Sequence, residues 1–391
     1  MQIKLFNVTV FLMFFLSGAN VLYSIHYPSE LPPLAFWGML LLMLSLGIHR
    51  LIYYKTELML IGLLVLVMFF NYITGRDIAV VAYLTAIMCP PFFSYAIGEL
   101  RWKIKKNKLQ KIIYLFYITN CVLAIFERLT YHCIFPNLGF ETGFNEWNDE
   151  FRSYSLYGHP LSNGEITLLL MNVILWSNLN MKKKYMLWLL GFAALLCFNS
   201  RLAILLSILV YIVYIIYRLF FTKKRASQKY FYVLNTILGL VLVSYLFSIG
   251  WGNRLINNDL LDGSASVRIF IWDIFKRQSW VTFLFGQKYS FMEQLMLRNG
   301  LSDYIIENCW ILFVFRYGIL FLSLMIVFYV PLFVKYLKHY SLIARFFIVI
   351  PWLMYISSSN SLATGGFSIT VLLLILYTFD DTKNNTLLLA K

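Results

Sequence analysis

Residues 201–221 read RLAILLSILVYIVYIIYRLFF, an almost wholly apolar run with arginines only near its ends. At 1.5 Å of rise per residue, a helix of this length crosses the roughly 30 Å of hydrocarbon in a bilayer. A helix also satisfies its own backbone hydrogen bonds, which lipid cannot do for it. The run is therefore predicted to be a membrane-spanning helix.

Similar runs recur along all 391 residues, of which 60% are hydrophobic and 13% charged, whereas about a quarter of the residues of an average soluble protein are charged. The predicted fold is an all-α, polytopic transmembrane bundle, a single integral membrane domain over residues 1–391. The first run is longer than the apolar part of a secretory signal and is interpreted as an uncleaved span. Hydropathy places about twelve spans at residues 5–24, 34–49, 57–73, 78–98, 111–130, 160–179, 184–199, 201–221, 230–250, 307–331, 343–358 and 366–379.

The basic residues indicate the orientation of this bundle. If the N-terminus is cytoplasmic, 22 of the 33 lysines and arginines fall on the cytoplasmic side, on alternate connections or at the termini. This satisfies the positive-inside rule and places both termini in the cytoplasm. The formal charge of +15 is then mostly a topology signal, so no nucleic-acid partner is expected, and anionic membrane lipid is the expected neighbour of the basic run 101–111.

Two longer connections are predicted on the opposite, outer side: residues 131–159, and the large loop 251–306 between spans nine and ten, which is expected to be partly helical. Eight of the ten basic residues assigned to the outer side are arginines. Arginine grips phosphate and carboxylate through two parallel hydrogen bonds, so these residues are candidates for an anionic substrate. Pairing with acidic residues on the same side is the alternative.

The end of the first outer loop carries a candidate imidazole. Pro160 suits the first turn of the sixth span, which would hold His159 at the membrane surface, facing either solvent or a shared cavity. Glu165 follows about one turn further in and needs a partner or a wet cavity there. A purely structural role for His159 is the alternative.

Three further charged residues are candidates at the outer side. Arg201 lies where two spans meet and either snorkels to lipid phosphates or points at a substrate. Arg268 shares a predicted helix face with Trp272, four residues on, and could instead pair with an aspartate of its own loop. Glu307 stands at the predicted start of the tenth span, where the helix dipole favours the ionised carboxylate. Arg316, within that span, should face the bundle interior.

In this order the outer motifs resemble those of the O-antigen polymerase and O-antigen ligase superfamily. They cover roughly residues 150–320 and read Arg152…Gly158-His159-Pro160-Leu161, Ser200-Arg201-Leu202-Ala203, Ser264…Arg268…Trp272 and Glu307-Asn308…Trp310…Tyr317-Gly318. The resemblance implies a multi-pass protein of the bacterial cytoplasmic (inner) membrane. It also implies that the protein acts on glycans carried by undecaprenyl diphosphate.

One sequence position, 307, helps to distinguish two branches of that superfamily. The Wzy-type polymerases transfer a growing glycan from undecaprenyl diphosphate to the next lipid-linked repeat unit, whereas the ligases transfer the finished chain to lipid A-core. In the ligases the last motif typically opens with a histidine before the asparagine, and here that position is Glu307. A polymerase is therefore the favoured function and a ligase the alternative. The competing class, a twelve-span transporter or flippase, would usually show repeated halves and polar residues near the midplane, and the sequence shows neither.

The expected chemistry is metal-independent glycosyl transfer. No outer loop has an Asp-x-Asp motif, and the five cysteines show no metal-binding spacing, so neither a metal nor another cofactor is expected. Arg268 and Arg201 would hold the diphosphate and Arg152 the donor or the acceptor, with Glu307 as the first candidate for the catalytic base and His159 as the second. The expected partners are the lipid-linked donor and acceptor, with a chain-length regulator and a flippase as further partners.

Overall fold

In the computed structural model, the regular secondary structure of the described residues is helical, apart from the two-residue antiparallel strands β1 (Phe144–Asn145) and β2 (Glu150–Phe151). The prediction of an all-α protein is confirmed. The described residues are 1–28, 31–76, 79–135, 144–145, 150–177, 179–221, 226–251, 271–272, 275–276, 278–288, 291, 294, 297–298, 306, 308–359 and 366–380.

A helix lies at each predicted span. The helices are α1 (Gln2–Phe15), α3 (Leu34–Leu46), α4 (Lys55–Ile73), α6 (Cys89–Leu100) with α5 (Val80–Ala82) and the π-helical turn η2 (Tyr83–Met88) before it, α7 (Lys106–Thr130), α8 (Pro160–Trp176), α9 (Met181–Phe198), α10 (Arg201–Phe220), α11 (Ala226–Ser248), α16 (Cys309–Leu337), α17 (Leu342–Ser357) and α19 (Ser368–Thr378). Five helical segments among the described residues are long and apolar enough to cross a membrane: α4, residues 80–100, α7, α10 and α16. A helical membrane protein is supported, and the number of spans stays a prediction.

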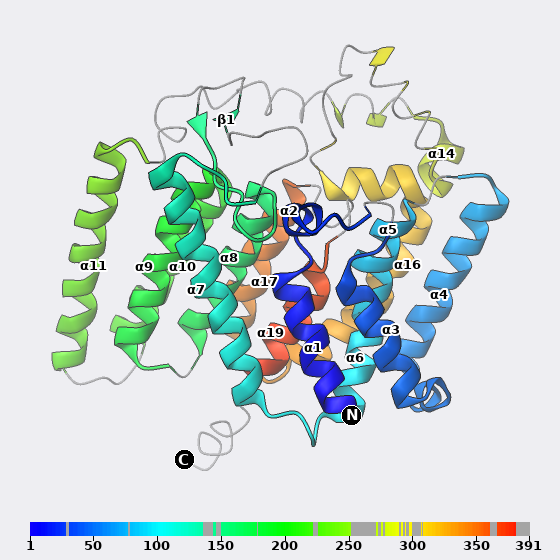
Figure 1. Ribbon diagram of the computed structural model, residues 1–391, viewed down its shortest axis with the longest axis horizontal. Coiled ribbons are helices and arrows are strands. Elements are labelled where there is room, and N and C mark those ends of the chain that lie inside the picture. Colours follow the sequence, from blue (N-terminus) through cyan, green and yellow to red (C-terminus); the bar gives the residue numbers. More distant parts are fainter. Residues whose placement is uncertain are drawn as a thin grey trace.

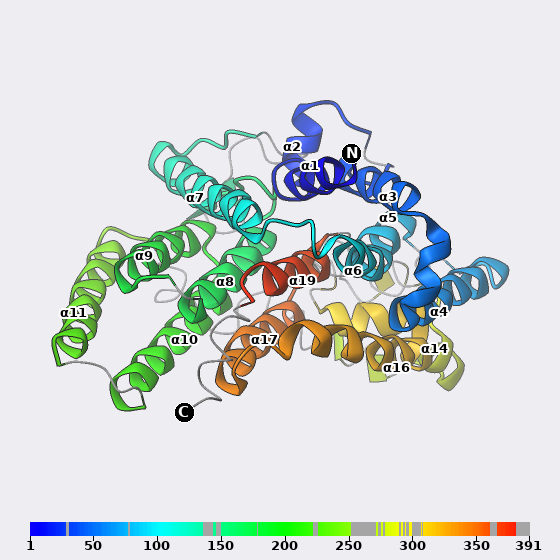
Figure 2. The ribbon, with the colours of Figure 1, turned by 90° about the horizontal axis from the view of Figure 1, so that it is seen from below.

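The helices run between two ends of the molecule, and α8 and α19 lie in the middle of the bundle (Figures 1 and 2). Nearly every residue of α8 is buried, and so is nearly every residue of α19. A mostly apolar helix is expected in such a position, because it has no continuous polar face to turn outward. The remaining long helices surround this pair, with α11 at one edge and α4 at the other.

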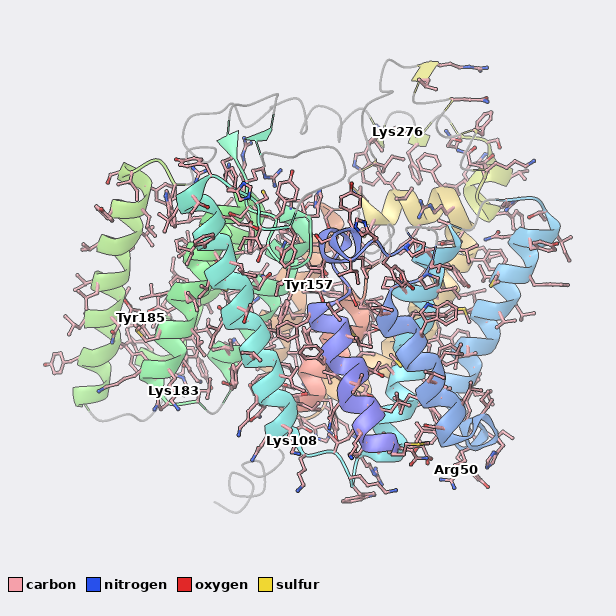
Figure 3. The ribbon with its side chains drawn as sticks, viewed as in Figure 1. Arg50, Lys108, Tyr157, Lys183, Tyr185 and Lys276 are labelled. Carbon is pink, nitrogen blue, oxygen red and sulfur yellow. The ribbon has the colours of Figure 1, made fainter. Side chains whose placement is uncertain are left out.

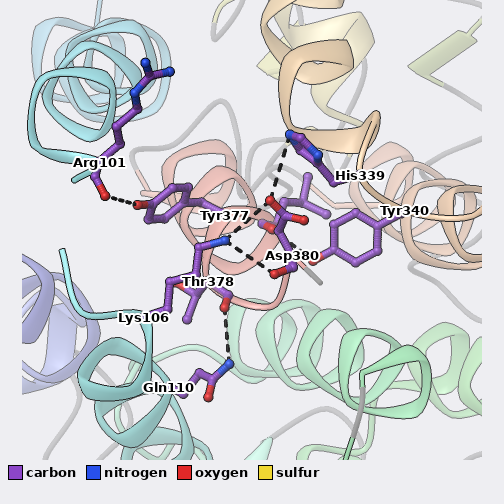
Figure 4. A network of polar contacts seen from close by, with 9 residues as sticks. Arg101, Lys106, Gln110, His339, Tyr340, Tyr377, Thr378 and Asp380 are labelled. Atoms are coloured by element: carbon purple, nitrogen blue, oxygen red, sulfur yellow. Dashed lines mark hydrogen bonds and ion pairs between the residues drawn. The ribbon is translucent and has the colours of Figure 1, made fainter. Parts of the chain in front are cut away.

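The basic residues of the predicted cytoplasmic connections lie together at one end of the molecule. Arg50, Lys108 and Lys183 lie at one end, which we call the basic end, and Lys276 lies at the other, which we call the loop end (Figure 3). At the basic end Lys106 and His339 approach the Asp380 carboxylate at 3.4 and 3.9 Å (Figure 4). The predicted cytoplasmic loops of Arg50, Lys108 and Lys183 thus share one end, and which end faces the cytoplasm stays a prediction.

The first predicted span, 5–24, is divided in the structure. Helix α1 ends at Phe15, and a separate short helix α2 (Ala19–Ser24) follows. Gly18, between them, is buried against the backbone of Leu156 and Tyr157, and a Cβ atom at Gly18 would overlap the Leu156 carbonyl oxygen. Hydropathy predicted one continuous helix because it does not register this backbone contact.

Residues 151–158, the last part of the first predicted outer loop, enter the bundle beside α7. Ser155 Oγ contacts the two oxygens of Asn120 at 2.8 and 2.9 Å, and Glu127 accepts backbone hydrogen bonds from Tyr154 at 2.8 Å and Ser155 at 3.0 Å. Asn120 lies about 15 Å along α7 from the helix end at Thr130. Non-helical backbone is tolerated at such a depth only where the protein supplies partners for its N–H and C=O groups. Asn120 and Glu127 supply such partners here.

Helix α16 is broken at Gly318, whose φ is 78°. The first part of α16, up to Tyr317, runs across the bundle, and the rest runs along it (Figure 1). The turn after the short helix α14 (Trp280–Phe285) packs into the break, and Gln287 donates its backbone N–H to Phe315 O at 2.7 Å. A side chain at position 318 would meet the Leu284 carbonyl, so the break depends on glycine.

We expect Gly18→Ala to destabilise the protein by about 1–3 kcal/mol, because the added methyl group overpacks the contact with Leu156. The matched control is Gly62→Ala, since a Cβ there has no atom within 4 Å and alanine improves helix propensity by about 1 kcal/mol. Thermal unfolding of the purified protein in detergent should show a lower midpoint for Gly18→Ala only. Equal midpoints for Gly18→Ala and the wild-type protein would contradict this packing argument.

Candidate functional site at the loop end

The start of α8 holds His159 in a defined position. Pro160 occupies the first turn as predicted, and His159 is the N-cap, its Nδ1 accepting the backbone N–H of Leu161 at 3.2 Å. Asn163 donates to the carbonyl oxygens of Tyr154 and His159, the latter at 3.1 Å. The entering segment and the first turn of α8 are thereby joined on both sides of His159.

Arg152 lies against the junction of α9 and α10. Its Nε donates to the Phe198 carbonyl oxygen at 3.2 Å, and the backbone N–H of Ser153 donates to Cys197 O at 3.1 Å. Phe198 ends α9, and Arg201 is the first residue of α10. Because only two residues separate these helices, the contact with Phe198 brings Arg152 to the chain segment that carries Arg201. Both arginine side chains are half-buried.

His159 is neutral at physiological pH. Burial by the surrounding protein lowers the pKa of His159 to about 4, and the charge of Arg152 acts in the same direction. By its accessible surface, however, His159 is an exposed residue, so the desolvation acts from one side of the ring. Arg152 is thus an electrostatic neighbour of His159. Since Nδ1 accepts a hydrogen bond, the ring proton lies on Nε2.

Helix α17 joins these pieces through two aromatic side chains that the sequence did not indicate. Tyr355 donates its hydroxyl to the Leu161 carbonyl at 2.9 Å and accepts from Ser200 at 2.8 Å, which ties the start of α10 to the first turn of α8. Trp352 donates its indole N–H to Glu165 at 3.0 Å. Glu165 is 1% exposed, so the prediction that its carboxylate needs a partner is confirmed.

The start of α16 reaches the same helix. Asn308 caps α16 by accepting the backbone N–H groups of Trp310 and Ile311, each at 3.1 Å, and the Trp310 indole donates to Ser357 of α17 at 2.6 Å. Arg316, in the first part of α16, is 8% exposed, so its predicted inward orientation is confirmed. The beginnings of α8, α10 and α16 therefore all contact the second half of α17.

Of the five candidate site residues, the structure describes Arg152, His159 and Arg201 and brings their chain segments together. Arg268 and Glu307 lie outside the described residues. Among the described residues, no group of three or more His, Cys, Asp or Glu side chains could hold a metal ion. The arrangement offers guanidinium groups and a neutral N–H donor to an anionic ligand.

No family model, no curated protein and no solved structure matches the chain. The resemblance of its motifs to the O-antigen polymerase and ligase superfamily therefore remains a prediction. What the site does has to be inferred from its own side chains.

The lowered pKa of His159 predicts how stability depends on pH. Between about pH 6.5 and pH 4 the unfolded state binds a proton that the folded state does not, so this residue makes stability fall as the pH is lowered through that window. His159→Asn keeps a capping oxygen and removes the titrating group. Its thermal midpoint should therefore fall less between pH 7 and pH 5 than that of the wild-type protein.

The control for this experiment is His26→Asn, because His26 is exposed and its left-handed backbone, with a φ of 56°, also accepts asparagine. This variant should follow the wild-type protein across the same pH range. An unchanged pH dependence in His159→Asn would exclude a neutral, desolvated imidazole at the start of α8.

Proposed function

We propose that the protein is a polysaccharide polymerase of the bacterial cytoplasmic membrane. It would transfer a growing glycan from undecaprenyl diphosphate to the next undecaprenyl-diphosphate-linked repeat unit, on the outer face of that membrane. The observation that carries the proposal is the meeting of Arg152, His159 and the Arg201 segment at the loop end of an apolar helical protein. A lipid-linked diphosphate would present its charge at such a membrane surface.

The proposed reaction needs positive groups that stabilise the charge on the leaving diphosphate. It also needs a base that accepts the proton of the attacking hydroxyl. A sugar hydroxyl of the acceptor attacks C1 of the donor glycan, the bond from C1 to the diphosphate oxygen breaks, and its electron pair leaves with the diphosphate. Arg201 and Arg268 would stabilise that developing charge, with Arg152 on the donor or the acceptor. Preorganised donors of this kind are typically worth about 10²–10³ in rate each.

The hydrogen bonding of His159 bears on which of the two candidates, His159 or Glu307, is the catalytic base. His159 is neutral and uses Nδ1 at the backbone of Leu161, so Nε2 carries the proton and suits hydrogen-bond donation better than proton abstraction. Glu307 is therefore the base that we propose, accepting the hydroxyl proton of the acceptor. His159 would instead donate from Nε2 to a substrate oxygen.

Replacing the arginines tests the diphosphate assignment. Arg201→Ala and Arg152→Ala should each slow chain growth by about 10²-fold or more, because a leaving diphosphate loses a charged donor. Arg201→Lys should be faster than Arg201→Ala but slower than the wild-type protein. Lysine keeps the positive charge but cannot form the two parallel hydrogen bonds of a guanidinium. Chain growth is measured as the product ladder that purified protein makes from lipid-linked repeat units.

The matched control is Arg50→Ala at the basic end, where the arginine is exposed and pairs with Glu99 at 3.3 Å. It should change the rate by less than about twofold, because an exposed ion pair of this kind is worth about 0–1 kcal/mol. Amounts of folded protein are compared by size-exclusion chromatography. Near-normal chain growth in both Arg201→Ala and Arg152→Ala would refute the assignment, and substrate flux without any ladder would favour a transporter.

A second comparison tests the base. Glu307→Gln removes the proton acceptor and should lose about 10²–10⁴ in rate, whereas Glu307→Asp keeps a carboxylate and should lose less. Single-turnover rates with saturating donor and acceptor separate this chemical step from binding. Equal rates for Glu307→Gln and Glu307→Asp would remove Glu307 from the chemistry.

A further inference from the structure

An apolar cavity of about 360 Å³ lies between α16 and α17. Its lining comes mainly from these two helices, with Ile87 of η2 and Ile369 of α19 behind them, and none of the described residues that line it is charged. An apolar cavity of about 150 Å³ is enough to bind benzene. A space more than twice that size suits a length of hydrocarbon chain.

The cavity opens sideways onto the outer surface of the bundle. Ile326, Val330 and Val334 line it and are still 44%, 51% and 55% exposed. In a helical membrane protein this surface meets the hydrocarbon of the bilayer. The wall from Leu322 to Leu337 is about 22 Å long at 1.5 Å per residue, which is most of the hydrocarbon thickness of about 30 Å.

Because α16 is broken at Gly318, its two parts line the cavity from two different directions. Trp310 and Phe313 line it, and they belong to the part of α16 that runs across the bundle before Gly318. The side walls come from the later part of α16 and from α17, both of which run along the bundle. A straight α16 could not supply both walls.

The cavity and the candidate site share two tryptophans. Trp352 lines the cavity and donates its indole N–H to Glu165, one turn into α8. Trp310 also lines the cavity and donates to Ser357, near Tyr355 on α17. The wall of the cavity is therefore bonded directly to the start of α8 through Trp352 and to the end of α17 through Trp310.

We propose that the cavity holds the polyprenyl chain of the lipid-linked substrate, which enters sideways from the bilayer between α16 and α17. The inference rests on the proposed function, because that function requires one amphiphile with a polar diphosphate at the loop end and a long apolar tail in the membrane. The continuity from Ile326 through Trp352 to Glu165 matches that division. The experiment below distinguishes this occupant from a phospholipid and from a second copy of this chain.

The first experiment locates the tail directly. The full chain is placed in nanodiscs of phosphatidylethanolamine and phosphatidylglycerol and irradiated with undecaprenyl diphosphate that carries a diazirine in its prenyl chain. Labelled peptides should come from α16 and α17, and excess unlabelled polyprenyl diphosphate should reduce the labelling about tenfold while excess phosphatidylglycerol does not. Equal displacement by phosphatidylglycerol, labelling elsewhere, or cross-linked copies of the chain would each overturn the proposal.

The second experiment uses two neighbouring positions. Ile326→Trp narrows the cavity, whereas Val327→Trp adds the same side chain at a position that is 63% exposed and does not line the cavity. Ile326→Trp should raise the KM for an undecaprenyl-linked donor about tenfold and leave the KM for a donor with a short prenyl chain unchanged. Val327→Trp should change neither. The same KM change in both variants would contradict a binding role for the cavity.

The two experiments separate this inference from the proposed function. If the prenyl chain labels α16 and α17 and no chain growth is detected, the cavity binds the lipid and the polymerase proposal fails. If chain growth is normal and the label appears elsewhere, the polymerase proposal stands and the cavity assignment fails.

Discussion

The candidate site depends on one constraint, that a non-helical backbone inside an apolar bundle must find every hydrogen bond within the protein. Residues 151–158 meet it through Glu127 and Asn120 on α7 and through Asn163 on α8. A backbone N–H or carbonyl left unpaired in hydrocarbon would cost several kcal/mol. The three polar side chains therefore fix the path of the segment, and with it the positions of Arg152 within it and His159 after it.

Charge at the loop end follows from this fixed path. Arg152 donates a hydrogen bond to the carbonyl of Phe198 at the end of α9. This carbonyl lies at the negative end of the helix dipole, which favours the positive charge of Arg152. Desolvation by nearby protein and the positive charge of Arg152 both lower the pKa of His159, although its side chain reaches the surface. The neutral imidazole keeps one N–H, on Nε2, and this group can donate a hydrogen bond beside the charge of Arg152.

The sequence predicted those parts of the molecule that depend on local pattern. Apolar runs placed the helices, Pro160 placed the start of α8, and the isolated carboxylate of Glu165 predicted a partner without naming it. The division of the first span at Gly18 was missed because its cause, the backbone of residues 156–157, is distant in the sequence. Trp352 and Tyr355 were missed for a similar reason: in an apolar span an aromatic residue looks the same whether it packs against lipid or bonds a distant helix.

The break at Gly318 connects the polar site with the membrane. Because α16 turns there, its first part lies across the bundle and carries Asn308 and Trp310 toward α17, while its second part faces hydrocarbon. The turn after α14 occupies the break, so this described part of the large loop and the lipid-facing wall belong to one packing arrangement. A change in that loop would therefore move both the N-cap of α16, next to Glu307, and the tryptophans that separate the site from the apolar cavity.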